Sequence, residues 1–383
     1  MNLSAFRHPL PVPARVLSKA LLLFLAANLL FAWLRPPVGS LLLFRHAPRF
    51  PSIWEPALGA EDESGTGFRR VMISDLGLLF HAHEISSQPK ARDEYRVILL
   101  GDSAGWGAYL LPEQTTSALI NHMNLRTCAG KKVKVYNLSY PFLSATKDLM
   151  ILSEAMKYEP DMIIWSFSLI GFTTERQKID FVAENPARLK YLKETYGLKP
   201  EIRLAPHIDS FGNHTLIGRR RELNLALRLN FSEVMLRVLG TDEPRAVDDN
   251  ARACRSPVMD NLDFRGFLPP ADLETYANLD GLKIAARLAG NARLIYVNEP
   301  TCIQPGGRTG VRYNVHYPHW AYDQYRLTLG EMARENGWTY VDLWDYLSSS
   351  EFSNSIFHRT PEGEQRLAQK FAEIILEQSC SQP

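Results

Sequence analysis

The fold class follows from one stretch of sequence, Val97-Ile-Leu-Leu-Gly-Asp-Ser-Ala-Gly-Trp-Gly107. Together with Arg96, its first residues form a short apolar run that ends at Gly101, which favours a strand buried on both faces of a parallel sheet. Ser103 follows directly, where a strand-to-helix turn exposes a hydroxyl near free backbone N–H groups. The stretch predicts an α/β sheet with a serine at its carboxyl edge.

The same alternation continues through the chain. Four further strands are predicted, at Lys132–Leu138, Pro160–Ser168, Ala292–Asn298 and Trp338–Leu343, with helices at Leu110–Asn124, Thr146–Lys157, Tyr322–Asn336 and Pro361–Gln378. Thr360 is expected to cap the last of these helices. Strands that alternate with helices indicate a parallel sheet covered on both faces, with ligand chemistry at the carboxyl ends of the strands.

Composition divides the chain into four parts. Residues 1–35 contain a long apolar run and are expected to be a membrane anchor, and 36–92 are rich in proline, glycine and charge, which predicts a linker and an irregular approach to the core. Residues 93–172 and 291–383 form the α/β core. Residues 173–290 are too long for a structureless loop and contain helical stretches at Pro186–Tyr196 and Arg219–Leu239, which predicts a mostly helical cap.

The N-terminal part contains a run, Val16–Leu34, with the roughly 20 mostly apolar residues that a helix needs to cross a bilayer. The run ends in Phe-Ala-Trp-Leu-Arg-Pro-Pro, without a small-x-small cleavage site, which favours an uncleaved anchor. A cleaved signal peptide and a buried or interfacial helix remain alternatives. An anchor predicts a single-pass membrane protein with its domain on the extracytoplasmic side, the periplasm of a bacterium.

Charge and cysteine usage narrow the function classes. Lys plus Arg total 43 against 42 Asp plus Glu, so the chain has no excess of positive charge of the kind that indicates nucleic-acid binding. The four cysteines, Cys128, Cys254, Cys302 and Cys380, lack metal-ligand spacing, and neither a metal nor another cofactor is expected. Disulfide pairing is possible outside the cytosol, but spacing does not fix the pairs. Nothing indicates the oligomeric state.

Ser103 needs a neighbouring base, because a serine hydroxyl is a poor nucleophile until its proton is taken. His358 is the best candidate, since it lies after the last strand and directly before the final helix, where the sheet edge can bring it to Ser103. The alternatives are a serine that caps a helix and a solvated loop histidine.

Together, these features resemble the SGNH (GDSL-type) hydrolase superfamily over roughly Tyr95 to Gln378. The resemblance is carried by Gly101-Asp102-Ser103 after a buried strand, the alternating order, and the terminal His358-x-x-Pro-x-Gly363. It implies a flavodoxin-like three-layer fold, a serine nucleophile, a histidine base, and an oxyanion hole made by the serine N–H, a glycine and an asparagine.

The chain departs from this pattern at the acid. An aspartate about three residues before the histidine is usual, whereas Ser355 lies three before it here and Asn354 four before it. We therefore expect Ser103, His358, Asn354 and Ser355 at the catalytic centre, with Asp342 and Asp345 as possible substitute acids. An amide or hydroxyl stabilises an imidazolium less than a carboxylate does.

The chain also departs at the oxyanion hole. Ser139 stands where a glycine is usual, and Ser168 follows the third strand where an asparagine is usual. The predicted oxyanion donors are Ser103, Ser139 and Ser168, with Asn137 as a further candidate.

Two main function hypotheses follow. The first is a membrane-anchored serine esterase or O-acyltransferase that forms an acyl-enzyme and acts on an acylated envelope glycan or lipid. The second is a non-catalytic SGNH-like protein that serves as a binding or assembly partner in envelope polysaccharide biosynthesis or export. A membrane-tethered interaction protein with a coincidental Gly-Asp-Ser is the third.

Overall fold

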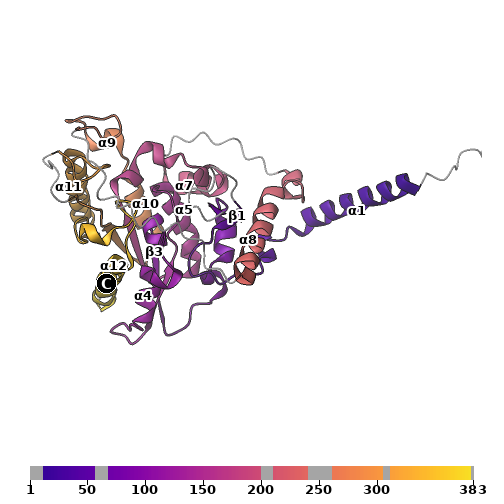
Figure 1. The fold of residues 1–383 in the computed structure, drawn as a ribbon, viewed down its shortest axis with the longest axis horizontal. Coiled ribbons are helices and arrows are strands. Elements are labelled where there is room, and N and C mark those ends of the chain that lie inside the picture. The colour runs from indigo at the N-terminus through magenta and orange to yellow at the C-terminus, as the bar shows by residue number, and fades with distance from the viewer. Residues whose placement is uncertain (1–11, 57–67, 200–209, 240–260, 305–310, 381–383) are drawn as a thin grey trace, which may run out of the picture.

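A five-stranded parallel sheet forms the centre of the molecule (Figure 1). The computed structural model describes residues 12–56, 68–199, 210–239, 261–304 and 311–380; His207 and Cys254 lie outside them. The strands lie in the order β4-β3-β5-β6-β7, and all five predicted strands are confirmed. They are β3 (Glu94–Leu100), β4 (Lys132–Asn137), β5 (Met162–Phe167), β6 (Arg293–Asn298) and β7 (Thr339–Asp342).

Helices cover both faces of this sheet. Alternate residues of β3 point to opposite sides, so that Val97 and Leu99 pack against α4 and α12, whereas Ile98 and Leu100 belong to a second apolar core. The first face carries α4 (Thr116–His122) and α12 (Pro361–Cys380); the second carries α2 (Leu76–Ala82), α5 (Ala145–Ala155), α10 (Asp280–Ala289) and α11 (His319–Asn336). The predicted three-layer α/β/α class is therefore confirmed.

The order of the strands places the site. β4 lies on one side of β3 and β5 on the other, so the strand order reverses at β3. Sheets of this kind bind ligands beyond the carboxyl ends of the strands at such a point. The short helix α3 (Ser103–Trp106) begins there, and Asp102 caps it by accepting a hydrogen bond from Ala104 N at 2.8 Å.

Several predicted helices differ in their bounds. The helix expected from Leu110 begins only at Thr116, because Pro112 starts a separate 3₁₀ turn (Pro112–Gln114) and Thr115 caps α4. Thr360 caps α12 as predicted, since its hydroxyl accepts a hydrogen bond from Gly363 N at 3.2 Å.

Residues 36–92 are more than the predicted linker. They form a 3₁₀ turn (Val38–Leu41), an antiparallel pair, β1 (Ile53–Pro56) with β2 (Phe68–Val71), the helix α2 and a second turn (Glu84–Ser87). Phe50, Ile73, Leu79 and Phe80 are buried in the main core. The apolar patches are short and separated by proline and charge, so no helical or strand period marks them in the sequence.

The described residues between 173 and 290 include five α-helices, separated by turns and irregular segments. They comprise α6 (Asp180–Ala183), α7 (Pro186–Tyr196), α8 (Arg220–Leu239), α9 (Leu273–Tyr276) and α10. The last of these belongs to the sheet layer rather than to a cap, because Tyr296 of β6 donates a hydrogen bond to Leu282 O at 2.7 Å.

The helix α1 (Val12–Leu34) extends away from the rest of the molecule (Figure 1). Its 23 residues reach about 34 Å, which exceeds the roughly 30 Å of a bilayer's hydrocarbon core. Its most apolar window has a mean hydropathy of 1.9 and is 11% buried. Among the described residues, it is the one helix long and apolar enough to cross a membrane.

A disulfide joins Cys128, in the turn before β4, to Cys380 at the end of α12. Cys302 is also disulfide-bonded. The first bond closes a loop across 252 positions and fastens the last helix to the edge of the sheet.

Replacing both Cys128 and Cys380 by serine is expected to lower the free energy of unfolding by about 2–4 kcal/mol, since the cross-link restricts the unfolded chain. The measurement is urea unfolding of both proteins with and without dithiothreitol. An unchanged midpoint in the double variant would contradict this role.

Candidate active site

Ser103 and His358 lie together although 255 positions separate them. Ser103 is the first residue of α3, and His358 lies in the turn that precedes α12. The Ser103 Oγ to His358 Nε2 distance is 2.9 Å. Because α12 packs on the sheet beside α4, the fold itself brings the imidazole to the serine.

The second nitrogen of His358 contacts an amide. Nδ1 lies 2.9 Å from Asn354 Oδ1. The amide oxygen accepts, so Nδ1 carries the proton and Nε2 is free to accept one from Ser103. Ser355, the other predicted partner, holds the turn instead: its Oγ accepts from Phe357 N at 3.1 Å and from His358 N at 2.9 Å.

Asp342 is engaged elsewhere. Its carboxylate accepts a hydrogen bond from Arg326 Nε at 2.9 Å and one from Asn298 Nδ2 at 2.9 Å. Asn354 therefore occupies the position that a carboxylate would need in order to support His358.

Burial lowers the pKa of His358 to about 4, and the charge of Asp102 opposes this effect while Arg359 and Arg70 add to it. The imidazole is therefore neutral at pH 7, the form that can accept a proton. Tyr109 covers its ring, with the ring centres 5.5 Å apart.

This environment predicts an unusual pH profile. If His358 is the base, kcat/KM for an acyl ester stays constant from neutral pH to about pH 5 and falls with a midpoint near pH 4, where the neutral form is lost. Initial rates from pH 3.5 to 8, with circular dichroism at each pH to monitor folding, give the measurement. A midpoint near the ordinary histidine value would contradict it.

The predicted oxyanion donors have different surroundings. Ser103 N lies at the open end of α3 and has no acceptor among the described residues. Ser139 N donates to Asn137 Oδ1 at 3.1 Å, while Asn137 Nδ2 donates to Gly105 O at 2.9 Å. Asn137 thus ties the end of β4 to α3. Ser168 is fully buried.

A cluster of carboxyl groups lies behind the serine. Asp102 and Glu299, which follows β6, are both buried, and the Glu299 carboxyl faces Asp102 and the Ser168 hydroxyl. Burial raises the pKa of Glu299 well above its ordinary value, and the charge of Asp102 raises it further. Asp102 in turn holds the turn that carries Ser103, because its carboxylate caps α3.

Two buried cations hold the same turn from either side. Lys147 of α5 donates to Gly101 O at 2.8 Å and pairs with Asp148 at 2.9 Å. Arg359 donates to Ala104 O at 2.8 Å.

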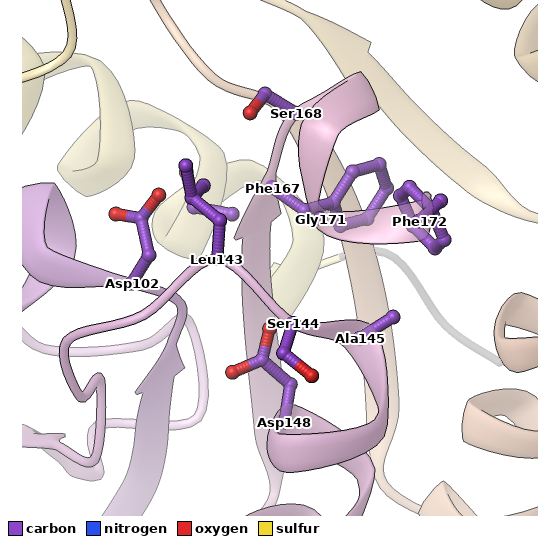
Figure 2. Close-up of a pocket in the computed structure, with 10 residues that line it drawn as sticks. Asp102, Leu143, Ser144, Ala145, Asp148, Phe167, Ser168, Gly171 and Phe172 are labelled. Atoms are coloured by element: carbon purple, nitrogen blue, oxygen red, sulfur yellow. The ribbon is translucent and has the colours of Figure 1, made fainter. Parts of the chain in front are cut away.

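A small pocket lies beside these groups, lined among others by Asp102, Leu143, Asp148 and Ser168 (Figure 2). Figure 2 shows Asp102 and Ser168 entering it from different elements, the turn after β3 and the end of β5. Ser103 and His358 are not among its lining residues, whereas Asp102, the neighbour of Ser103, is.

Sequence reasoning missed Glu299, Lys147 and Arg359. The available signal was their position: Glu299 directly follows a predicted buried strand, and Arg359 follows His358. Charged residues at such places are seldom buried unless they are paired.

Comparisons with known proteins found no protein-family model and no curated protein that matches the chain. Among solved structures, a lipase/acylhydrolase from Enterococcus faecalis aligns at 12% identity and a TM-score of 0.38, over 74% of this chain and 96% of that one. A carbohydrate acetylesterase family member from Sinorhizobium meliloti aligns at 9% identity and a TM-score of 0.32, over 73% and 96%. Such weak alignments assign no activity. The chain's own strand order, β4-β3-β5-β6-β7, gives it a flavodoxin-like three-layer α/β/α fold, and Ser103 and His358 lie together beyond the strand ends.

Proposed function

We propose that this chain is a serine-dependent acyl-ester hydrolase or O-acyltransferase. One observation carries the proposal: the hydrogen-bonded series from Ser103 Oγ through the His358 ring to Asn354 Oδ1, with both distances 2.9 Å. A neutral imidazole between a hydroxyl and an orienting acceptor is the arrangement that activates a serine.

In the proposed reaction, Ser103 Oγ bonds to the carbonyl carbon of an ester while His358 Nε2 takes the hydroxyl proton. The carbonyl oxygen becomes an oxyanion, for which Ser103 N–H is available as a donor. Collapse breaks the bond to the alcohol oxygen, which leaves with the proton from His358, and Ser103 keeps the acyl group.

Water or an alcohol then resolves this acyl-enzyme. His358 accepts the proton of the incoming hydroxyl, which attacks the acyl carbon, and Ser103 regains its proton. Water gives a free acid, and a sugar hydroxyl gives an O-acylated product.

The proposed location is a membrane, with α1 as a single-pass anchor and the domain on the extracytoplasmic side. The length and exposure of α1 support an anchor, and two disulfide-bonded positions, Cys128 and Cys380, support an oxidising compartment. An acylated envelope glycan or a lipid is the proposed substrate class, inferred from this location.

The test compares the full chain in detergent with Ser103→Ala and His358→Ala on a small activated acyl ester. We expect turnover by the native protein and only background by both variants, with a fluorophosphonate labelling the native protein but not Ser103→Ala. Equal turnover in all three proteins, or none in any, would overturn the catalytic proposal. Added sugar alcohols that capture the acyl group would distinguish transfer from hydrolysis.

The second candidate function is a non-catalytic binding or assembly partner in envelope polysaccharide biosynthesis or export. The amide of Asn354 favours it, because an amide cannot offset the positive charge that His358 gains during catalysis. This candidate predicts that fluorophosphonate leaves Ser103 unlabelled in the folded protein.

A further inference from the structure

A row of exposed apolar side chains runs along α8. Leu227, Phe231, Val234 and Val238 recur at the spacing of one helical face, and their exposed fractions are 67, 68, 39 and 77%. The opposite face, with Ala226, Leu229 and Ser232, is buried against the domain. Exposed large apolar side chains that gather on one face mark a contact surface.

Hydrogen bonds fasten α8 to the chain that emerges from α1. Arg219, directly before α8, donates to Pro36 O at 2.8 Å. Asn230 donates to Leu41 O at 2.9 Å and accepts from Leu43 N at 2.8 Å; the Leu43 side chain is itself 72% exposed. In Figure 1, α8 runs across the direction of α1, at the end where α1 meets the domain.

The segment before α8 lies alongside α1 itself. Ile217 N donates to Asn28 Oδ1 at 3.3 Å, and the 3₁₀ turn Phe211–His214 contacts α1. Asn28 lies six residues before Leu34, or about 9 Å along the helix. A bilayer that covers α1 as far as Leu34 therefore reaches the level of Phe211 and Ile217, whose side chains are 55 and 53% exposed.

We propose that α8 and residues 211–217 form a membrane-docking surface, whose apolar side chains enter the interfacial region of the bilayer that α1 crosses. A phospholipid bilayer is the partner that fits, because α8 is hydrogen-bonded to the chain that leaves an apolar helix of spanning length, and the segment before α8 lies beside that helix. The proposal rests on the membrane location proposed for α1 and is independent of the chemistry at Ser103.

Docking would fix the domain against the membrane instead of leaving it on a single tether. The entrance to Ser103 would then stay at a constant height above the lipid, which suits a membrane-bound or surface-bound acyl substrate.

The test uses the full chain reconstituted in phosphatidylcholine vesicles, with a fluorophore on a cysteine introduced by Leu227→Cys. Leu327→Cys on α11 is the matched control, because Leu327 is 69% exposed and lies on the part of the molecule far from α1 (Figure 1). We expect lipids with a spin label near the headgroup to quench the Leu227 probe at least twofold and to leave the Leu327 probe unchanged.

A second variant separates docking from folding. Phe231→Glu, combined with the Leu227 probe, is expected to lose most of the quenching with an unchanged Tm.

The outcomes that contradict docking are distinct. Equal quenching of the two probes by labelled lipid, in protein that floats with the vesicles, would overturn docking while retaining the anchor. A second copy of the chain could instead cover the row. The Leu227 probe would then be protected from solvent without being quenched by lipid, and this protection would be lost on dilution in detergent. That result would also overturn docking to the bilayer. Protein that fails to float would overturn both docking and anchor. Quenching is expected to be the same in Ser103→Ala, so failure of the proposed chemistry would leave this result unchanged.

Discussion

Replacing Asn354 by aspartate is expected to raise kcat/KM for an acyl ester by roughly 10- to 1000-fold, because a carboxylate stabilises the imidazolium that an amide does not. Asn354 Oδ1 already lies 2.9 Å from His358 Nδ1, so the substitution places the charge with little rearrangement. The same charge raises the pKa of His358 from about 4 toward its ordinary value, which moves the acid limb of the rate profile upward.

Initial rates against pH for the native protein and Asn354→Asp measure both effects. Ser355→Asp is the matched control: it introduces the same charge one position along, where the side chain accepts from backbone N–H groups instead of from the imidazole. We expect no gain from it. A rate in Asn354→Asp equal to that of the native protein would show that support of the imidazolium does not limit the reaction.

Replacing Arg359 by methionine is expected to lower the free energy of unfolding by about 3–5 kcal/mol, the cost of removing one partner of a buried ion pair. Arg359 and Glu364 are both nearly inaccessible, and Arg359 Nε donates to Glu364 Oε1 at 2.7 Å. Without the guanidinium, the Glu364 carboxylate keeps only its contacts with Thr116 in a buried place.

Urea unfolding measures this cost, and Arg366→Met provides the comparison. Arg366 also pairs with a glutamate, Glu351, but 47% of its side chain is exposed, so its loss is expected to cost no more than about 1 kcal/mol. Arg359→Met combined with Glu364→Gln should recover part of the stability, because the orphaned charge is gone. Equal destabilisation by Arg359→Met and Arg366→Met would contradict the argument.

The sheet could be predicted because its strands are buried on both faces and therefore read as continuous apolar runs. Met162–Phe167 is visible in this way, whereas Lys132–Asn137 is marked by alternating polar and apolar residues; Pro160 before Met162 and Gly101 after Leu100 mark boundaries. Residues 36–92 could not be placed, because β1 and β2 are four residues each and pair only with one another, outside the central sheet. Tertiary packing, rather than a local period, decides such short elements.

The positions of Ser103 and His358 could be predicted from strand ends, since parallel strands gather the following residues at one edge. The contacts that surround these two residues could not be predicted in the same way. That Asn354 rather than Ser355 reaches the imidazole depends on a turn in which Ser355 is already used by backbone N–H groups. The raised pKa of Glu299 depends on its burial near Asp102, which no spacing in the sequence reveals.

The distance along the chain between Ser103 and His358 has a consequence for biosynthesis. At typical elongation rates, the 255 positions between them take roughly 10–50 s to synthesise. Throughout this time the serine has no base, because His358 reaches it only when α12 docks on the sheet. Under the proposed function, a nascent chain would therefore be chemically silent toward acyl groups until its last helix has docked.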